Sequence, residues 1–322
     1  MNIIIKTPSF IGDTVMMMPA LELLFQEYPQ ASFTVVCKNS SKDLFRGKNI
    51  SKIIIDDTKN TKKGRLKRTF KLISIIKEER YDLGVLFHNT FLDALVFKLS
   101  NIDTIIGYDK ENRKVLLDFY LKIDRTRHYV NHYCNLVNQY LNNKYTDIPK
   151  MLLYSKKSKL LDNKNHLPYI GFVLGGENKD TRRYPKELSL ELFKILKDEK
   201  INIVLLGDKD DSYNNDEYEK YLKEQNCNVI NYSGKTTVAE YIDIISELDQ
   251  LVTIDTSAVH ISAAVDTKFI LLVGKGSSAI DTTYPKVDFG EMIFKGYNKI
   301  KDEDLIYQIK PLDIKKSIMD KI

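Results

Sequence analysis

The sequence of 322 residues has no tryptophan and only three cysteines. The cysteines, Cys37, Cys134 and Cys227, are scattered, so they fit neither a paired zinc motif nor a disulfide framework, and this usage suits a reducing cytoplasm. No apolar run approaches the ~18–20 residues that a membrane-spanning helix needs. The N-terminus lacks the basic segment, apolar stretch and cleavage site of a signal peptide, so the sequence predicts a cytoplasmic protein.

The chain also lacks two common nucleotide-binding motifs. It contains no G-x-G-x-x-G and no P-loop, which argues against a standard nicotinamide enzyme and against an NTPase. No Ser–His–Asp arrangement can be assigned from the order of the residues. With 43% hydrophobic and 29% charged residues and a net charge of +5, the composition is that of a soluble globular protein.

Short apolar runs alternate with longer amphipathic ones along the chain. The short runs predict strands at 2–6, 33–37, 52–55, 83–87, 104–106, 169–174, 202–206, 228–230, 250–254 and 269–273. The amphipathic patterns predict helices at 14–27, 66–79, 128–142, 186–199, 215–225, 237–248 and 258–265. This alternation predicts an α/β fold, in which parallel sheets carry helices on both faces.

Segment 145–168 is rich in Lys, Asn and Asp and has the composition of a linker. Because the chain is too long for one ordinary core, we expect two doubly wound, Rossmann-like domains at 1–155 and 156–322. The last helix is a candidate to pack back on the first domain. Ligands are expected in a central cleft that the two domains face, beyond the carboxyl ends of the strands.

Three polar loops, 7–13, 175–185 and 255–260, follow predicted strands and precede predicted helices. They therefore fall on the face where an open α/β sheet binds ligands. Asp13 closes the first loop, just before a helix that is apolar on nearly all sides. It is either the N-cap of that helix or a carboxylate at the mouth of a site, and one residue can do both.

The second loop, GGENKDTRRYP, combines glycines with arginines. Gly175 and Gly176 allow the backbone to approach a ligand closely. Arg182 and Arg183 can clamp a phosphate with paired hydrogen bonds, or they are surface arginines at the start of a helix.

The third loop lies in TIDTSAVHISAA, where a buried strand ends at Asp255. Thr256, Ser257 and the N–H groups of the next turn can bind an anion at a helix N-terminus. His260 follows one turn later and either faces the same pocket or packs as a neutral core residue.

A basic segment lies between Asp57 and Glu78, where no acidic residue occurs. Its cations include Lys62, Lys63, Arg65, Lys67 and Arg68, and a more dilute basic group further on includes Arg113. Each of these two basic groups is either a solvated helix face or a docking surface for phosphorylated glycolipid, membrane headgroups or nucleic acid. Residues 59–68 contain no stacking aromatics, which disfavours nucleic acid.

Four blocks of the sequence resemble the family 9 glycosyltransferases, the bacterial lipopolysaccharide heptosyltransferases. IIIKTPSFIGDTVMMMPALELLFQEYP resembles the opening of the family, and YDLGVLFHNTFLDALVFKLSNIDTIIGYDKENRKVLL resembles its next block, including Ile-Gly-Tyr. GGENKDTRRYP is similar to its Lys-x-Trp-Pro segment, and DTSAVHISAA to its Asp-x-Gly-x-x-His-x-x-Ala-Ala signature. The blocks occur in the family's order from residue 1 to about residue 275.

The resemblance implies a fold of the glycosyltransferase B type, with the lipid acceptor on the N-terminal domain and the nucleotide of ADP-heptose on the C-terminal domain. By motif position, Asp13 matches the general base, and Arg182 stands where the family has the Lys that meets the diphosphate. Asp208 or Asp210 would take the place of the acid that holds the adenosine ribose. The sequence departs from the family's motifs at two positions of the expected donor pocket, where Ser257 replaces the usual Gly and Tyr184 replaces the usual Trp.

The resemblance therefore implies an inverting transferase that moves heptose from ADP-heptose to the inner core of lipopolysaccharide. Asp13 would take the acceptor proton and Arg182 would stabilise the departing diphosphate, so no metal or other cofactor is needed. The expected donor-binding residues are Gly12, Gly175, Gly176, Arg183, Asp208, Asp210, Asp255, Thr256, Ser257 and His260. The expected acceptor-binding residues are Lys62, Lys63, Arg65, Lys67, Arg68 and Arg113.

The expected partners are a nucleotide-sugar donor, an anionic lipopolysaccharide-core acceptor and the cytoplasmic face of the inner membrane, with no nucleic acid. HYVNH, residues 128–132, has the spacing of zinc-binding histidines but no Glu between them, so it predicts helix surface or an acceptor contact. The alternatives are another nucleotide sugar or a protein acceptor on the same fold, a non-catalytic nucleotide-sugar binder, and a basic nucleic-acid-binding protein.

Overall fold

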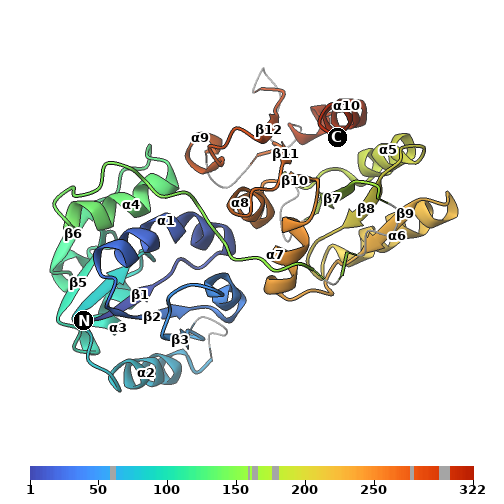
Figure 1. The fold of residues 1–322 in the computed structure, drawn as a ribbon. Helices are drawn as coiled ribbons and strands as arrows, with labels where there is room; N and C mark the ends of the chain where they lie inside the picture. Colours follow the sequence, from blue (N-terminus) through green and yellow to red (C-terminus); the bar gives the residue numbers. More distant parts are fainter. Residues whose placement is uncertain (59–62, 159, 162–165, 176–180, 276–278, 297–304) are drawn as a thin grey trace. The chain divides into compact units, whose positions relative to one another are not determined.

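The computed structural model describes residues 1–58, 63–158, 160–161, 166–175, 181–275, 279–296 and 305–322 (Figure 1). The chain divides into two compact units, Met1–Tyr154 and Ser155–Ile322. Each unit contains a six-stranded sheet whose strands all run parallel. The predicted α/β fold with two doubly wound parallel sheets is confirmed.

The first unit has the strand order β3-β2-β1-β4-β5-β6. Its elements are β1 (Asn2–Lys6), α1 (Ile11–Glu27), β2 (Ser32–Cys37), η1 (Asn39–Phe45), β3 (Lys52–Ile55), α2 (Arg65–Ile76), β4 (Leu83–Leu86), α3 (Phe91–Leu99), β5 (Thr104–Asp109), η2 (Arg113–Leu116), β6 (Phe119–Lys122) and α4 (Tyr129–Tyr140). The order reverses between β1 and β4, and such a switch point is where an open sheet leaves room for a ligand.

Alternating side chains of the central strands bind helices to both faces of this sheet. Ile4 belongs to a core cluster that also contains side chains of α2 and α3, whereas α1 packs against α4 (Figure 1). Nearly every residue of α1 from Thr14 to Leu24 is buried, which agrees with its apolar sequence.

The second unit has the corresponding order β12-β11-β10-β7-β8-β9, with its switch point between β7 and β10. Its elements are β7 (Tyr169–Val173), α5 (Lys186–Leu196), β8 (Asn202–Leu205), α6 (Ser212–Glu224), β9 (Asn228–Asn231), α7 (Val238–Ser246), β10 (Gln250–Ile254), α8 (Ser257–Ala264), β11 (Phe269–Leu272), α9 (Ile280–Thr283), β12 (Gly290–Ile293), η4 (Ile306–Gln308) and α10 (Pro311–Met319). The last helix, α10, packs against α5 and β11 of its own unit.

Several elements were not predicted from the sequence, among them β6, β12, α3, α9 and the short η helices. Strands β6 and β12 lie at the edges of their sheets and have only four residues each, with exposed side chains among them. Helix α3 has nine residues and starts at the N-cap Thr90, whose hydroxyl oxygen accepts a hydrogen bond from Asp93 N. Helix α1 begins at Ile11, three residues before the predicted start, and this difference changes the position of Asp13.

Candidate active site

Asp13 lies within the first turn of α1 and not at its N-cap. Phe10 occupies the N-cap position and makes no side-chain capping hydrogen bond. Gly12 and Asp13 are both half-buried, in the segment that follows β1. The capping interpretation of Asp13 is therefore wrong, although a carboxylate in the first turn still interacts favourably with the helix dipole.

The charge of Asp13 acts on Tyr133 of α4. Burial raises the pKa of Tyr133 well above its ordinary value, and the negative charge of Asp13 raises it further. Tyr133 is 5% exposed and its ring meets the Phe87 ring edge-on at 5.7 Å, just after β4. Tyr133 of α4 is thus within electrostatic reach of Asp13, and it packs in turn against Phe87 at the end of β4.

Three further side chains at these strand ends form a hydrogen-bonded chain. Ser9 Oγ lies 2.9 Å from His88 Nε2, and His88 Nδ1 lies 2.5 Å from Asp93 Oδ2. The order of the residues did not reveal this Ser–His–Asp arrangement, because Ser9 and His88 are 79 positions apart.

Arg113 was expected among the acceptor-binding cations, whereas the structure buries its side chain completely. Its guanidinium donates to the carbonyl oxygens of Tyr108, His88 and Thr90 and to Asn89 Oδ1, at 2.7–3.2 Å. Burial lowers the pKa of Arg113 to about 10, against the opposing effect of Asp93 and other nearby acids. Arg113 therefore holds the β4–α3 and β5–η2 loops together and is not part of an exposed basic rim.

The two histidines of HYVNH are buried, so the prediction of a helix surface is wrong. His128 is the N-cap of α4, and its Nδ1 accepts a hydrogen bond from Val130 N at 3.3 Å. The His132 ring stacks on Tyr108 with a centroid distance of 3.8 Å, and burial lowers its pKa to about 4. Within the described ranges no three His, Cys, Asp or Glu side chains are grouped as metal ligands would be.

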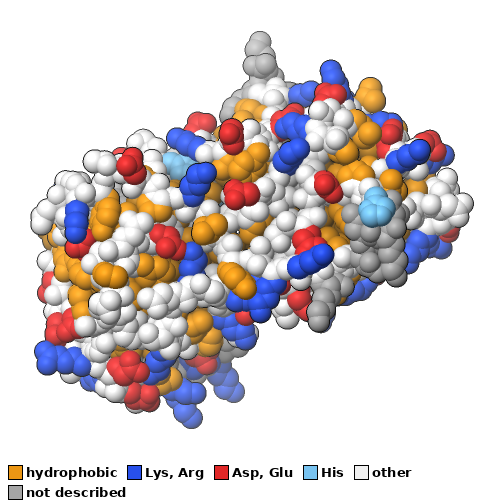
Figure 2. All heavy atoms as spheres, viewed as in Figure 1, with side chains coloured by type: hydrophobic (Ala, Val, Ile, Leu, Met, Phe, Trp, Pro, Cys, Tyr) orange, Lys and Arg blue, Asp and Glu red, His pale blue; other side chains and the backbone are white. Residues whose placement is uncertain are grey.

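The basic segment enters α2, whose outer surface carries both cations and apolar side chains. Lys63, Arg65 and Lys67 are exposed, and Arg68 is half-buried with Nη1 donating to the Lys63 carbonyl at 2.9 Å. Lys62 lies outside the described residues. Lys and Arg side chains are visible at the lower edge of the first unit, where α2 lies (Figure 2).

In the second unit, the structure brings two of the predicted loops together. Arg182, which follows β7, lies at the end of β10, where its Nη1 is 3.2 Å from both the carboxylate and the backbone carbonyl of Asp255. Both side chains are mostly buried, at 15% and 19% exposed. Thr256 is the N-cap of α8 and accepts a hydrogen bond from Ala258 N at 3.3 Å.

The neighbouring residues fix this arrangement. Tyr184 is buried and its hydroxyl donates to the Ile309 carbonyl at 2.9 Å, which anchors the segment that carries Arg182. Ser257 is the first residue of α8, and His260 lies one turn later, 6% exposed. The site therefore combines a guanidinium, a carboxylate and the N-terminus of α8 at the switch point of the sheet.

The charge of Arg183 acts on a different acid, Asp211, which the sequence analysis did not select. Burial first, and then the charge of Asp208, raise the pKa of Asp211 to about 6 against the opposing charge of Arg183. A Cβ at Gly175 would lie 1.9 Å from Asp211 Oδ1, so only glycine leaves room for this carboxylate. Gly176 lies outside the described residues.

The two acids that were expected to hold the ribose are exposed. Asp208 Oδ1 accepts hydrogen bonds from Asp210 N at 2.9 Å and from Asp211 N at 3.3 Å, which shapes the β8–α6 turn. Asp211 in turn accepts from Asp208 N at 3.1 Å. Of the three acids in this turn, the buried one is thus Asp211. Gly175 and Gly207 leave the space that its carboxylate occupies, and no spacing in the sequence predicted this contact.

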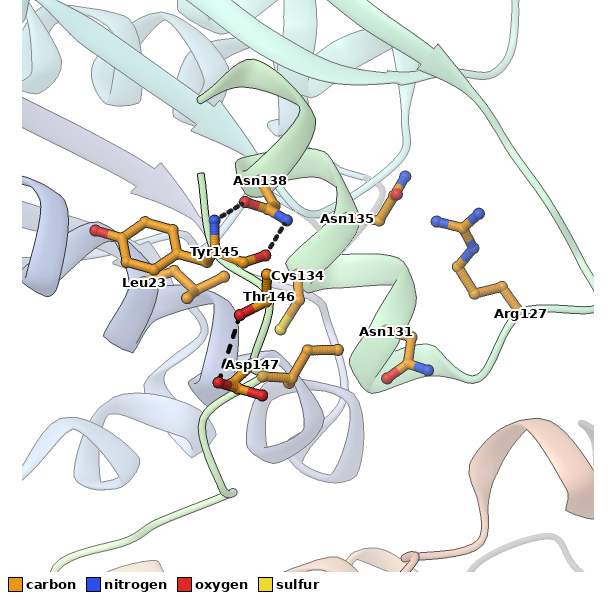
Figure 3. A pocket seen from close by; sticks show the side chains of 10 residues that line it. Leu23, Arg127, Asn131, Cys134, Asn135, Asn138, Tyr145, Thr146 and Asp147 are labelled. Atoms are coloured by element: carbon orange, nitrogen blue, oxygen red, sulfur yellow. Dashed lines mark hydrogen bonds between the residues drawn. The ribbon is translucent and has the colours of Figure 1, made fainter. Parts of the chain in front are cut away.

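A pocket of about 260 Å³ in the first unit is lined by none of the predicted catalytic or donor-binding residues, but Asn131 of the HYVNH segment is part of its wall (Figure 3). Asn131 and Asn135 of α4, with Arg127, line it opposite residues 145–148. Asn138 is bonded on both sides to the Tyr145 backbone, at 2.7 and 2.9 Å, and so holds the wall of the pocket. No helix in the described part of the chain is long and apolar enough to cross a membrane.

Comparison with known proteins gives a consistent match. The family model for glycosyltransferase family 9 (heptosyltransferase) matches residues 69–285. The chain is 26% identical over 328 residues to lipopolysaccharide heptosyltransferase 2 of Salmonella typhimurium, covering 94% of this chain and 91% of that protein. It is 26% identical over 301 residues to lipooligosaccharide heptosyltransferase 2 of Haemophilus influenzae, covering 86% and 84% of the two chains.

Solved structures share the fold over the full length. The ADP-heptose lipopolysaccharide heptosyltransferase II of E. coli superposes with a TM-score of 0.84 at 23% identity, covering 99% of this chain and 98% of that chain. A family 9 glycosyltransferase of Veillonella parvula gives a TM-score of 0.83 at 18% identity, with 99% and 96% covered. The predicted fold class, the glycosyltransferase B type, is confirmed.

Proposed function

Since this chain belongs to glycosyltransferase family 9, the heptosyltransferases, we propose that it transfers heptose from ADP-heptose to the inner core of lipopolysaccharide. The observation that carries the proposal is the placement of Arg182, Asp255 and Thr256 together at the ends of β7 and β10. A guanidinium beside a helix N-terminus is suited to a diphosphate, because both supply hydrogen bonds to anionic oxygens.

Arg182 is the group that we assign to the departing diphosphate. Its guanidinium has five N–H donors, and both described contacts to Asp255 come from Nη1, so the pair with Asp255 uses neither Nε nor Nη2. The carboxylate of Asp255 fixes the orientation of the fork before the donor binds. Preorganised charge of this kind stabilises the negative charge that develops on the leaving group.

Asp13 is the group that we assign to the acceptor hydroxyl. As the acceptor oxygen forms its bond to the anomeric carbon, its proton passes to the Asp13 carboxylate and the bond from that carbon to the diphosphate oxygen breaks. The configuration at the anomeric carbon inverts in this single displacement. Asp13 remains accessible in the first turn of α1, as a general base must be to reach the hydroxyl proton.

The outer surface of α2 is the region that we assign to the membrane-bound acceptor. Leu66 is 76% exposed and Phe70 65% exposed, one helical turn apart, and Lys63, Arg65 and Lys67 surround them. Cations attract anionic headgroups and exposed apolar side chains enter the interface, so this combination suits peripheral binding at the cytoplasmic face of the inner membrane.

Turnover assays with ADP-heptose and defined core acceptors test the proposal. We expect one heptose to be transferred and ADP to be released. Two alternatives predict other outcomes: turnover of a different nucleotide sugar, or of a protein acceptor, would identify another transferase of the same fold. ADP-heptose binding by calorimetry without turnover of any acceptor would indicate a non-catalytic binder.

A further inference from the structure

The hydrogen-bonded side chains of Ser9, His88 and Asp93 lie just after the carboxyl ends of β1 and β4, and they connect a buried carboxylate to a half-buried serine. Asp93 is 7% exposed and also accepts a hydrogen bond from the Thr90 hydroxyl. His88 and Ser9 are half-buried. The two neighbouring strands place these loops together at the switch point of the first sheet, where ligands bind.

The ionised carboxylate of Asp93 sets the direction of its hydrogen bond with His88. An ionised carboxylate only accepts hydrogen bonds, and the hydrogen bond from His88 helps to hold the pKa of Asp93 down at about 2 although burial opposes it. His88 Nδ1 therefore carries the proton that is shared with Asp93, and Nε2 of a neutral ring accepts from the Ser9 hydroxyl. The lone pairs of Ser9 Oγ are left to accept a hydrogen bond from a ligand.

We propose that Ser9 determines acceptor specificity, because His88 and Asp93 present its hydroxyl oxygen as a hydrogen-bond acceptor to one sugar hydroxyl of the acceptor. This inference rests on the proposed function. Ser9 lies four residues before Asp13, and the next residue, Phe10, is 71% exposed. A sugar ring has apolar C–H faces and polar edges, so an aromatic ring beside an oriented hydroxyl is suited to bind it.

The rival explanation is a structural tie between the β1–α1 and β4–α3 loops. Two substitutions of His88 separate the two roles, because asparagine places its amide near the position of Nδ1 and glutamine near that of Nε2. His88→Gln keeps a partner for Ser9, whereas His88→Asn keeps a partner for Asp93 and removes the one for Ser9. Ser9→Ala removes the acceptor contact itself, and His166→Gln, at an exposed position of the second unit, is the control.

The measurements are the KM for the core acceptor, kcat, ADP affinity and melting temperature of each variant. We expect Ser9→Ala and His88→Asn to raise the acceptor KM about 5- to 10-fold, the range for one lost neutral hydrogen bond, with ADP affinity unchanged. His88→Gln should stay within about twofold of the wild type, as should His166→Gln.

Two results would overturn the inference while leaving the proposed function intact. The first is a wild-type acceptor KM in Ser9→Ala. The second is an equal change in KM for His88→Gln and His88→Asn that follows their melting temperatures, which is the signature of a structural tie. A wild-type enzyme that turns over no ADP-heptose with any acceptor would instead refute the proposed function.

Discussion

Arg182 Nη1 lies 3.2 Å from the carboxylate and 3.2 Å from the backbone carbonyl of Asp255, so one guanidinium nitrogen joins two loops that are 73 positions apart. Hydrogen bonds at both points restrict the rotation of the Arg182 side chain. A lysine has no planar fork and would hold the same charge without this orientation. The arrangement explains how an arginine can serve at this position of the proposed donor site.

Arg182→Ala is expected to weaken ADP binding by about 1.5–3 kcal/mol, the range for a hydrogen bond to a charged group. Arg182→Lys should recover only part of this loss, because the charge remains and the fork does not. Calorimetry with ADP measures both variants. Acceptor affinity should not change, and unchanged ADP affinity in Arg182→Ala and in the double variant with Arg183→Ala would show that the diphosphate binds elsewhere.

Asp13→Asn is expected to lower turnover about 10²–10⁴-fold, the effect of a lost general base. The folded state should lose only about 0.3–1 kcal/mol, since one charge in the first turn of a helix contributes that much. Steady-state rates and ADP calorimetry on the same preparation separate chemistry from donor binding. A turnover close to that of the wild type would remove Asp13 from the mechanism.

Arg113→Met is expected to destabilise the first unit by about 3–5 kcal/mol, as when one member of a buried charged network is removed. The carbonyl oxygens of Tyr108, His88 and Thr90 would lose their donor, and the loop that carries His88 would lose its anchor. Lys114→Ala, at the exposed next position, is the control and should change stability by less than about 0.5 kcal/mol. Chemical denaturation of both variants tests this role, and equal stabilities would contradict it.

Local patterns predicted the central strands and long helices because those strands are continuous apolar runs and those helices carry an amphipathic repeat. Edge strand β6 offered no such signal, since alternate residues of its four-residue span are exposed among charged neighbours. The predicted loops at Arg182 and Asp255 do meet, which follows from the pairing of β7 with β10. The burial of Arg113 and the Ser9–His88 contact depend on strand order, which no local spacing encodes.

Asp211 is expected to make stability depend on pH. Its pKa is about 6 in the folded chain and near the ordinary value of 3.8 when unfolded, so between these values the folded state binds more protons. Stability is therefore lost as the pH rises through this window, and Asp211→Asn should relieve the loss by up to about 3 kcal/mol at about pH 7. Denaturation at about pH 4.5 and at about pH 7 should show a larger advantage of the variant at the higher pH. Asp210→Asn, at an exposed position, is the control.

The outer surface of α2 is expected to concentrate the anionic acceptor before specific contacts form. Removing the exposed charges of Lys63, Arg65 and Lys67 together should raise the apparent KM for the acceptor at low salt and leave ADP affinity unchanged. The difference from wild type should shrink as salt rises, because exposed charges are screened beyond ~8–10 Å at about 0.1–0.15 M ionic strength.

The matched control removes three exposed lysines of the second unit, Lys194, Lys197 and Lys200. Both triple variants change the net charge by the same amount, so a general effect of charge on solubility or on encounter would appear in both. A specific surface on α2 predicts a raised acceptor KM in the first variant alone, and it also predicts weaker binding to anionic vesicles. If the two variants have the same KM at low salt, α2 is a solvated helix face and the acceptor docks on another part of the enzyme.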